Sequence, residues 1–157
     1  MVGKILIVLL LFSFSQDKID TYINYIDTNK DLVSIERKVD MPSCDGTSLI
    51  EYYLQDNLVK SILYIGKSNN NLEIKFYFKK QHIIFIDYNS YSFKYDDEAN
   101  IFRDSIFLSL NKRYYIENNV AIDSIVSSFK HDHITRSEDI YSKELLSIFS
   151  DLKFEEE

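Results

Sequence analysis

The sequence predicts an α+β domain: an antiparallel β-meander of about six strands, arranged as three hairpins and packed on one face by an N-terminal and a C-terminal helix. Three features of the sequence lead to this prediction. Apolar residues recur with a helical period near both ends, they alternate with polar residues through the middle, and an aromatic-rich segment occurs three times in that middle part. The chain has 157 residues, a length typical of one domain.

Composition excludes several classes of protein. Hydrophobic residues make up 45% of the chain and charged residues 27%, which is typical of a globular domain rather than a disordered one. Cys44 is the only cysteine, so an internal disulfide and a multi-cysteine metal site are excluded. The net charge of −7 is opposite to the basic footprint of nucleic-acid-binding proteins, and we expect no nucleic-acid partner.

Residues 1–15 have the pattern of a secretory signal peptide. Lys4 precedes a continuous apolar run at 5–12, and a small-x-small cleavage site ends at Ser15. The run is shorter than the about 20 apolar residues that a membrane-spanning helix needs. We therefore expect cleavage after Ser15, a single mature α+β domain at 16–157, a periplasmic or secreted location and no stable membrane span. Retention of the segment as an anchor is the alternative.

The first helix is expected at 17–28. Apolar residues there follow the i, i+3, i+4, i+7 pattern, and Asp17 is suited to cap the N-terminus. Residues 32–47 show no clear period and are expected to be irregular. Near the other end, Thr135 and Glu138 form a capping box before a second helix, whose apolar face would consist of Tyr141, Leu145, Ile148, Phe149 and Leu152.

The middle of the chain has the two-residue period of β-strands. In the segment 72–79, Leu72, Ile74, Phe76 and Phe78 alternate with Glu73, Lys75, Tyr77 and Lys79. A second segment, from Ile106 to Ile116, alternates in the same way and is interrupted only by Lys112. Such alternation predicts a sheet with one apolar face. We expect both helices to pack on that face and the opposite face to be largely exposed or to bind a partner.

Three similar segments define the hairpins, which we expect at about 48–66, 71–91 and 105–127. Each has two aromatic residues, one apolar residue, a short polar turn and then aliphatic residues. An acidic connection at 96–104 separates the last two hairpins. In this alignment Tyr53, Tyr77 and Tyr115 occupy equivalent places.

These hairpin segments resemble a repeated motif of the form Tyr-Tyr-Phe-Asp-Asn-Gly-Lys-Leu-Ile in a group of uncharacterised small exported bacterial proteins. The similar region covers residues 48–125. The resemblance implies an exported protein with an N-terminal helix and a curved antiparallel sheet, and it implies no functional residues.

Few motifs indicate catalysis. His131 and His133 flank Asp132 and could ligate a metal, with a polar surface loop as the alternative. The acidic run 96–98 lacks the spacing of a calcium loop and is expected to be solvated. Neither a G-x-S-x-G elbow nor a glycine-rich phosphate loop is present, so we expect no cofactor and no enzymatic activity.

The tyrosines are the remaining signal. Tyr53, Tyr77 and Tyr115, together with Lys75 and Arg113, would form a partner-binding patch on the non-apolar face, or a cross-strand ladder that stabilises the sheet.

The leading hypothesis is an exported, non-enzymatic protein that binds a protein or a cell-envelope component. The alternatives are a small-ligand or glycan binder that uses the tyrosine-bearing face and a metal-dependent enzyme at His131 and His133. The oligomeric state stays open.

Overall fold

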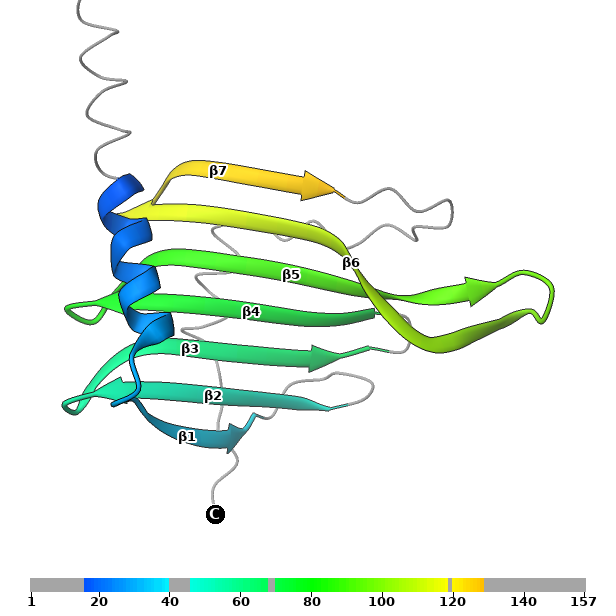
Figure 1. Ribbon diagram of the computed structural model, residues 1–157, viewed down its shortest axis with the longest axis horizontal. Coiled ribbons are helices and arrows are strands. Elements are labelled where there is room, and N and C mark those ends of the chain that lie inside the picture. The colour runs from blue at the N-terminus through cyan, green and yellow to red at the C-terminus, as the bar shows by residue number, and fades with distance from the viewer. Residues whose placement is uncertain (1–15, 40–45, 68–69, 119, 129–157) are drawn as a thin grey trace, which may run out of the picture.

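The computed structural model describes residues 16–39, 46–67, 70–118 and 120–128. They form one helix, over residues 16–28, and one antiparallel sheet whose seven strands follow each other in chain order (Figure 1). The strands are β1 (Val33–Lys38), β2 (Thr47–Leu54), β3 (Asn57–Gly66), β4 (Asn70–Lys79), β5 (His82–Asp96), β6 (Ile101–Glu117) and β7 (Val120–Ser128). The predicted antiparallel meander and its three hairpins are thereby confirmed.

The strand count differs from the prediction because of β1. Residues 32–47 were expected to be irregular, yet Val33–Lys38 pairs with β2 at the edge of the sheet. All six residues of β1 are exposed, so nothing requires its apolar residues to alternate with polar ones. Glu36, Arg37 and Lys38 give this edge the charges that discourage pairing with another chain.

The predicted acidic connection at 96–104 is shorter than expected. β5 and β6 continue past the main sheet as a two-stranded arm, and the turn occupies only residues 97–100 (Figure 1). Asp96 Oδ1 accepts hydrogen bonds from the backbone N–H groups of Glu98 and Ala99, both at 3.1 Å. The carboxylate of Asp96 therefore stabilises the turn of the arm. The second helix, expected after Thr135, lies outside the described residues.

The first two hairpins use the same tight turn, and Asn118 begins the third turn in the same left-handed conformation. Two central residues in the left-handed region match the right-handed twist of the flanking strands, as in type I′ turns. Glycine, asparagine and aspartate are usual at such positions, but this chain also places lysine and glutamine there. The turn residues with positive φ are Gln55 (50°), Asp56 (63°), Lys80 (51°), Gln81 (66°) and Asn118 (52°).

Each hairpin also has a β-bulge at the same distance from its turn. The register shifts after Tyr52 in β2, after Tyr77 in β4 and after Tyr115 in β6. Tyr52 is thus the structural equivalent of Tyr77 and Tyr115, and the expected equivalence of Tyr53 is wrong by one residue. On the partner strands the shifts leave one extra aliphatic residue per hairpin: Val59, Ile84 and Ile122.

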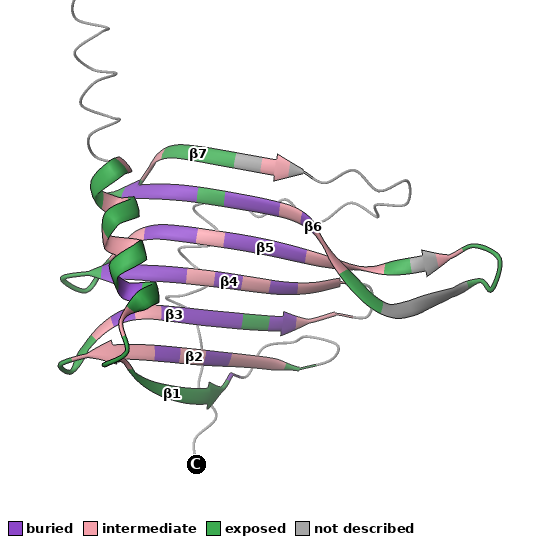
Figure 2. Cartoon of the chain, viewed as in Figure 1, coloured by how far each residue is buried: buried purple, intermediate pink, exposed green. Residues whose placement is uncertain are grey.

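One face of the sheet is mostly apolar, as the alternation predicted, and its buried polar residues include Ser61, Ser90 and Lys112. We call it the apolar face. Leu49, Leu63, Ile74, Phe76 and Ile86 are completely buried there, and strands β2 to β6 are buried along much of their length (Figure 2). Burial of each such side chain contributes about 1.5–3 kcal/mol relative to its exposed state.

The helix packs on the opposite face, which corrects the prediction that it would cover the apolar face. It crosses the sheet at the end where the three hairpins turn (Figure 1). A second apolar cluster lies beneath it, with Ile26 of the helix and Tyr77, Phe85 and Tyr115 of the sheet at its centre. The extra residues of the bulges belong to this cluster, so the bulges supply apolar surface that strict alternation would not.

Two tyrosine–carboxylate contacts hold the helix to this helix-bearing face. The Tyr77 hydroxyl lies 3.0 Å from both carboxylate oxygens of Asp27, and the Tyr115 hydroxyl donates to Asp20 Oδ1 at 2.9 Å. Lys60 Nζ lies 2.7 Å from Asp27 Oδ1. These contacts give the helix a defined position along the sheet as well as an apolar base.

Candidate functional site

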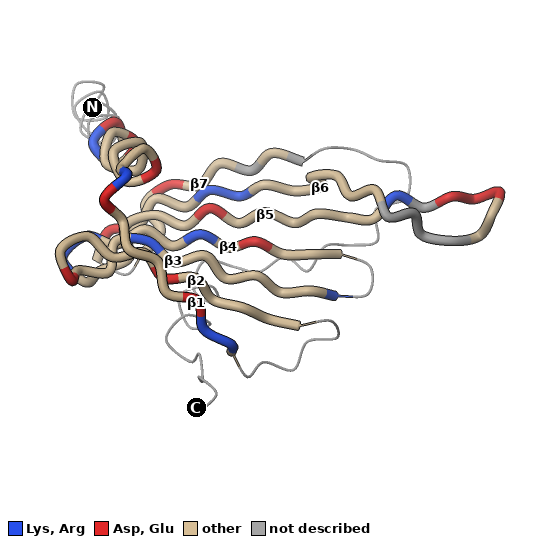
Figure 3. The backbone as a smooth tube through the Cα atoms, turned by 60° about the horizontal axis from the view of Figure 1, so that its bottom comes forward, with Lys and Arg blue, Asp and Glu red and all other residues tan. Residues whose placement is uncertain are grey.

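Beyond the helix, the helix-bearing face has two polar rows that run across β4, β5 and β6. In the first row Lys75 pairs with Asp87, which pairs with Arg113. In the second row Glu73 pairs with Asn89, which pairs with Asn111. We call these six residues the polar cluster. Figure 3 shows the acidic and basic segments of the three strands side by side.

Hydrogen bonds link the two rows into one network. Asn111 Nδ2 donates to Asp87 Oδ1 and to Asn89 Oδ1, both at 2.7 Å. Asn89 Nδ2 in turn donates to Asp87 Oδ2 at 3.3 Å and to Glu73 Oε1 at 3.4 Å. Asn89 and Asn111 are buried, so their amides hold the carboxylates of Asp87 and Glu73 in fixed positions.

The cations complete the network from the solvent side. Lys75 Nζ lies 3.1 Å from Glu73 Oε1, and Arg113 Nε lies 3.7 Å from Asp87 Oδ1. The side chains of Glu73 and Asp87 are each 17% exposed, whereas those of Lys75 and Arg113 are 27% and 53% exposed. The four charges sum to zero, but the positive ones are the more accessible to a partner.

Electrostatics keep Lys75 charged. Burial by itself lowers the pKa of its ammonium, but the hydrogen bond and charge of Glu73 and the charge of Asp87 raise it, and the resulting pKa lies above the ordinary value. Lys75 therefore carries its proton throughout the neutral range.

Two tyrosines flank the polar cluster. Tyr64 pairs with Glu73 from β3, and Tyr91 follows Asn89 by two positions along β5, on the same face. Burial raises the pKa of both phenols, and the negative charge of Glu73 raises it further. Both tyrosines stay protonated and keep a hydroxyl donor near the cluster.

The structure separates the five residues predicted for partner binding. Lys75 and Arg113 lie together in the polar cluster. Tyr77 and Tyr115 are 2% and 4% exposed beneath the helix, where their hydroxyls bind Asp27 and Asp20.

Tyr53 lies away from both groups. Its hydroxyl donates to Glu51 Oε2 at 3.0 Å, and Arg37 Nε donates to the same oxygen at 2.8 Å. Tyr53 alternates with Leu49 and Glu51 on the apolar face, and the bulge in β3 brings Leu58 to the same face as its partner.

Sequence reasoning did not select Glu73, Asp87, Asn89 and Asn111 as site residues. The signal was present as polar pairs two positions apart in three successive strands. Two polar residues spaced by two positions lie on the same face of their strand, but this spacing does not show which residues of the neighbouring strands lie beside them. Only the register shows that the three pairs line up.

His131 and His133, predicted as metal ligands, lie outside the described residues. Within the described residues, no group of three or more histidine, cysteine or acidic side chains is arranged to hold a metal ion. A search of the same residues finds no helix with the length and apolar content that a membrane crossing needs.

Comparisons with protein-family models, with curated proteins and with solved structures found no match to this chain.

Proposed function

We propose that this protein is an exported, non-enzymatic binding protein that uses the polar cluster to bind a protein partner of the cell envelope or its surroundings. The observation that carries the proposal is the two-row network on β4, β5 and β6. Hydrogen bonds from buried asparagines fix its carboxylates, while Lys75 and Arg113 remain accessible. A network held in this way needs little reordering when a partner binds, which lowers the entropic cost of association.

The shape and chemistry of this face favour a protein over a small molecule. The cluster lies across three neighbouring strands of one sheet, whereas small-molecule sites are concave and mostly apolar. Tyrosine and arginine are enriched in protein interfaces, and Tyr64, Tyr91 and Arg113 lie at or near the cluster. Because the cations are its most exposed charges, we expect the partner to present carboxylates, and we expect added salt to slow association.

Export is the second part of the proposal. It rests on the leader pattern of residues 1–15, and N-terminal sequencing of the protein from its native host tests it. A mature chain that begins at Gln16 and is recovered outside the cytoplasm would support export, whereas an intact N-terminus would argue for an anchored protein.

The binding proposal is tested by site-directed photo-cross-linking. A photo-reactive amino acid at position 113 should capture a defined partner in the native host. The same amino acid at position 36, an exposed place on β1 at the far edge of the sheet, is the control and should not capture it. Capture of the same proteins from both positions would contradict the proposal.

Affinity measurements with the purified partner complete the test. Arg113→Gln should weaken binding by about tenfold, since a charged interfacial contact is lost. Lys38→Gln, which removes the same charge from the exposed edge strand, should leave the affinity unchanged. Equal weakening by both substitutions would show a general charge effect and would count against the cluster.

A glycan ligand is the second candidate, because aromatic rings lie beside hydrogen-bonding groups. Tyr64 neighbours Glu73, and Tyr91 follows Asn89 on the same face. A thermal-shift screen with glycans tests it: a hit should disappear in Tyr64→Ala or Tyr91→Ala and persist in Tyr25→Ala, which changes a tyrosine 53% exposed on the helix. A hit that persists in all three variants would locate the glycan elsewhere.

A further inference from the structure

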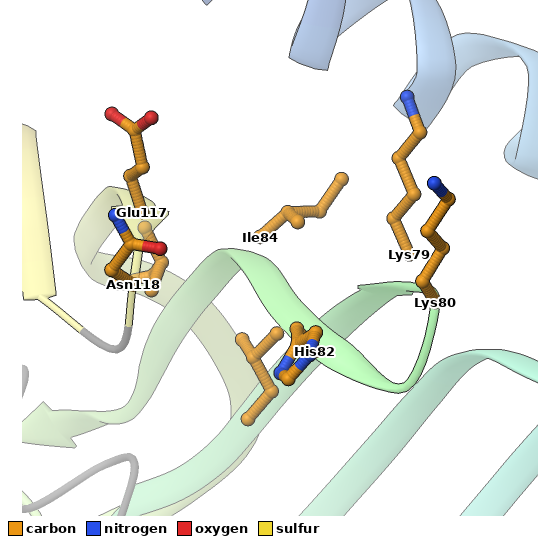
Figure 4. Close-up of a pocket in the computed structure, with 8 residues that line it drawn as sticks. Lys79, Lys80, His82, Ile84, Glu117 and Asn118 are labelled. Atoms are coloured by element: carbon orange, nitrogen blue, oxygen red, sulfur yellow. The ribbon is translucent and has the colours of Figure 1, made fainter.

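A groove separates the turns of the second and third hairpins, at the end of the sheet next to the helix. Its volume is about 490 Å³, which is within the range of small-molecule sites. Lys79 and Lys80 lie on one side of it, Glu117 and Asn118 lie on the other, and His82 lies between (Figure 4). Ile83, Ile84 and Ile116 also line it, and of these Ile84 lies on the helix-bearing face.

Local structure places the two lysines and the histidine near each other. Lys79 and His82 are the last cross-strand pair before the turn, so their side chains share one face. Lys80 is the first turn residue and adopts a φ of 51°, a conformation that costs a lysine about 1–2 kcal/mol. Asparagine or glycine would avoid most of this cost at that position. The turn thus keeps an unfavourable residue whose ammonium lies at the groove.

The helix helps to hold Lys79. Its Nζ atom lies 5.5 Å from the centre of the Tyr22 ring, and the Tyr22 hydroxyl donates to the carbonyl of Phe78 at 2.6 Å. A cation held over an aromatic ring loses less freedom when it binds an anion. The groove therefore has one ammonium held by the helix, a second on the turn and an imidazole between the two walls.

We propose that this groove binds a phosphate ester with a hydroxyl-bearing organic part, such as a glycerol phosphate. The two ammonium groups and the His82 ring would bind the phosphate, since lysine is a common phosphate ligand. Ile84, on the helix-bearing face, would contact the carbon chain. Glu117 and the Asn118 amide on the opposite wall would accept and donate hydrogen bonds to hydroxyls. The site is separate from the polar cluster, and its occupancy does not depend on the protein partner proposed above.

Two sources share this chemistry, a soluble phosphate ester and the headgroup of a phospholipid. The first arm of the test titrates the full mature protein, labelled with ¹⁵N in histidine, with glycerol 3-phosphate and with inorganic phosphate, and follows the ring signals of His82 by NMR. His82→Gln assigns these signals. The second arm measures co-sedimentation with phosphatidylcholine vesicles that do or do not contain phosphatidic acid.

Lys80→Gln is the test variant, because Gln55 and Gln81 show that glutamine fits the left-handed conformation of these turns. Lys94→Gln, on the exposed arm at the other end of β5, is the charge-matched control. We expect a saturable shift with glycerol 3-phosphate that is weakened about tenfold by Lys80→Gln and unchanged by Lys94→Gln.

The outcomes separate clearly. Lys80-dependent binding to the soluble ester alone assigns a soluble ligand, and Lys80-dependent sedimentation with phosphatidic acid vesicles assigns a lipid headgroup. Absence of saturable binding in both arms, or equal weakening by the two substitutions, would overturn the proposal.

Discussion

The contact between Tyr77 and Asp27 makes a quantitative prediction about how the helix is held. Tyr77 is 2% exposed, and its hydroxyl lies 3.0 Å from each oxygen of the Asp27 carboxylate. Burial and the adjacent carboxylate raise the pKa of this phenol far above its ordinary value, so the hydroxyl keeps its proton and remains a donor. Tyr77→Phe removes that donor and leaves the ring in place.

The expected loss of stability depends on which contacts of Tyr77 and Asp27 remain after the substitution. A hydrogen bond to a charged group contributes about 1.5–3 kcal/mol. The side chain of Asp27 is 39% exposed, and its Oδ1 atom stays 2.7 Å from Lys60 Nζ. Water and Lys60 can therefore still bind the carboxylate after the tyrosine hydroxyl is removed. The phenylalanine retains the edge contact with Phe85, whose ring centre lies 5.7 Å away. We therefore expect a loss of about 1.5 kcal/mol, near the lower limit, and a fall in Tm of about 3–6 °C.

Urea unfolding followed by circular dichroism measures this loss. Tyr25→Phe is the matched control, since Tyr25 is on the same helix but 53% exposed, and it should change stability by less than about 0.5 kcal/mol. A double-mutant cycle with Asp27→Asn should give a coupling energy of about 1 kcal/mol. Equal stability of the two single tyrosine variants, or a coupling energy near zero, would refute the role assigned to this contact.

Three further predictions concern other parts of the fold. Burial and the hydrogen bond to Asp20 raise the pKa of Tyr115 to about 12, against about 10 in an unfolded chain, so its stabilising contribution is present below about pH 10 and is lost as the pH rises from about 10 to 12. Tyr115→Phe should make alkaline unfolding less steep in that window, and an unchanged slope would argue against the shift. Gln81→Gly should stabilise the protein by about 1 kcal/mol in urea unfolding because φ is 66° there, and a loss of stability would show that the side chain has another role. Ser61 Oγ is buried without a hydrogen-bond partner among the described residues, whereas Ser109 Oγ donates to the carbonyl of Ser90 at 2.8 Å. In the same assay Ser61→Ala should be neutral or stabilising and Ser109→Ala should cost about 1 kcal/mol; the reverse order would contradict both assignments.

The hairpins and the first helix could be predicted because each has a strong local signal. The helical period of residues 17–28 and the alternation of 72–79 depend only on near neighbours in the sequence, and the structure has a helix at 16–28 and a strand at Asn70–Lys79. Strand β1 has no such signal because all of its residues are exposed. Local periodicity therefore identified the elements that bury a face and missed the one that does not.

The face covered by the helix could not be predicted from periodicity. A bulge inserts one residue into one strand of a pair, and this changes which residues share a face without changing the composition of the segment. Ile84 and Phe85 are adjacent in the sequence, yet both belong to the cluster under the helix. Strict alternation would place them on opposite faces, and only one of the two would then lie under the helix.

The same limit applies to the candidate site. Lys75 and Arg113 were selected from the sequence because they alternate with apolar residues in two separate strands. Their common neighbour, Asp87, is on the strand between them, and the pairing of Lys75, Asp87 and Arg113 in one row depends on the register of both strand pairs. The bulge after Tyr77 takes part in setting the register of β4 and β5, so a shift of one residue in that pair would break the alignment of Lys75 with Asp87.

The three bulges therefore connect the fold to the proposed function. They supply the extra aliphatic residues on which the helix packs at the turn end, and the helix in turn covers the row of Tyr77, Phe85 and Tyr115. The next row along the strands is that of Lys75, Asp87 and Arg113, which the register places directly beside the covered row. The helix thus forms one border of the polar cluster. A partner that binds the cluster would meet this border, so the part of the helix that flanks the cluster is the first place to look for a second set of contacts.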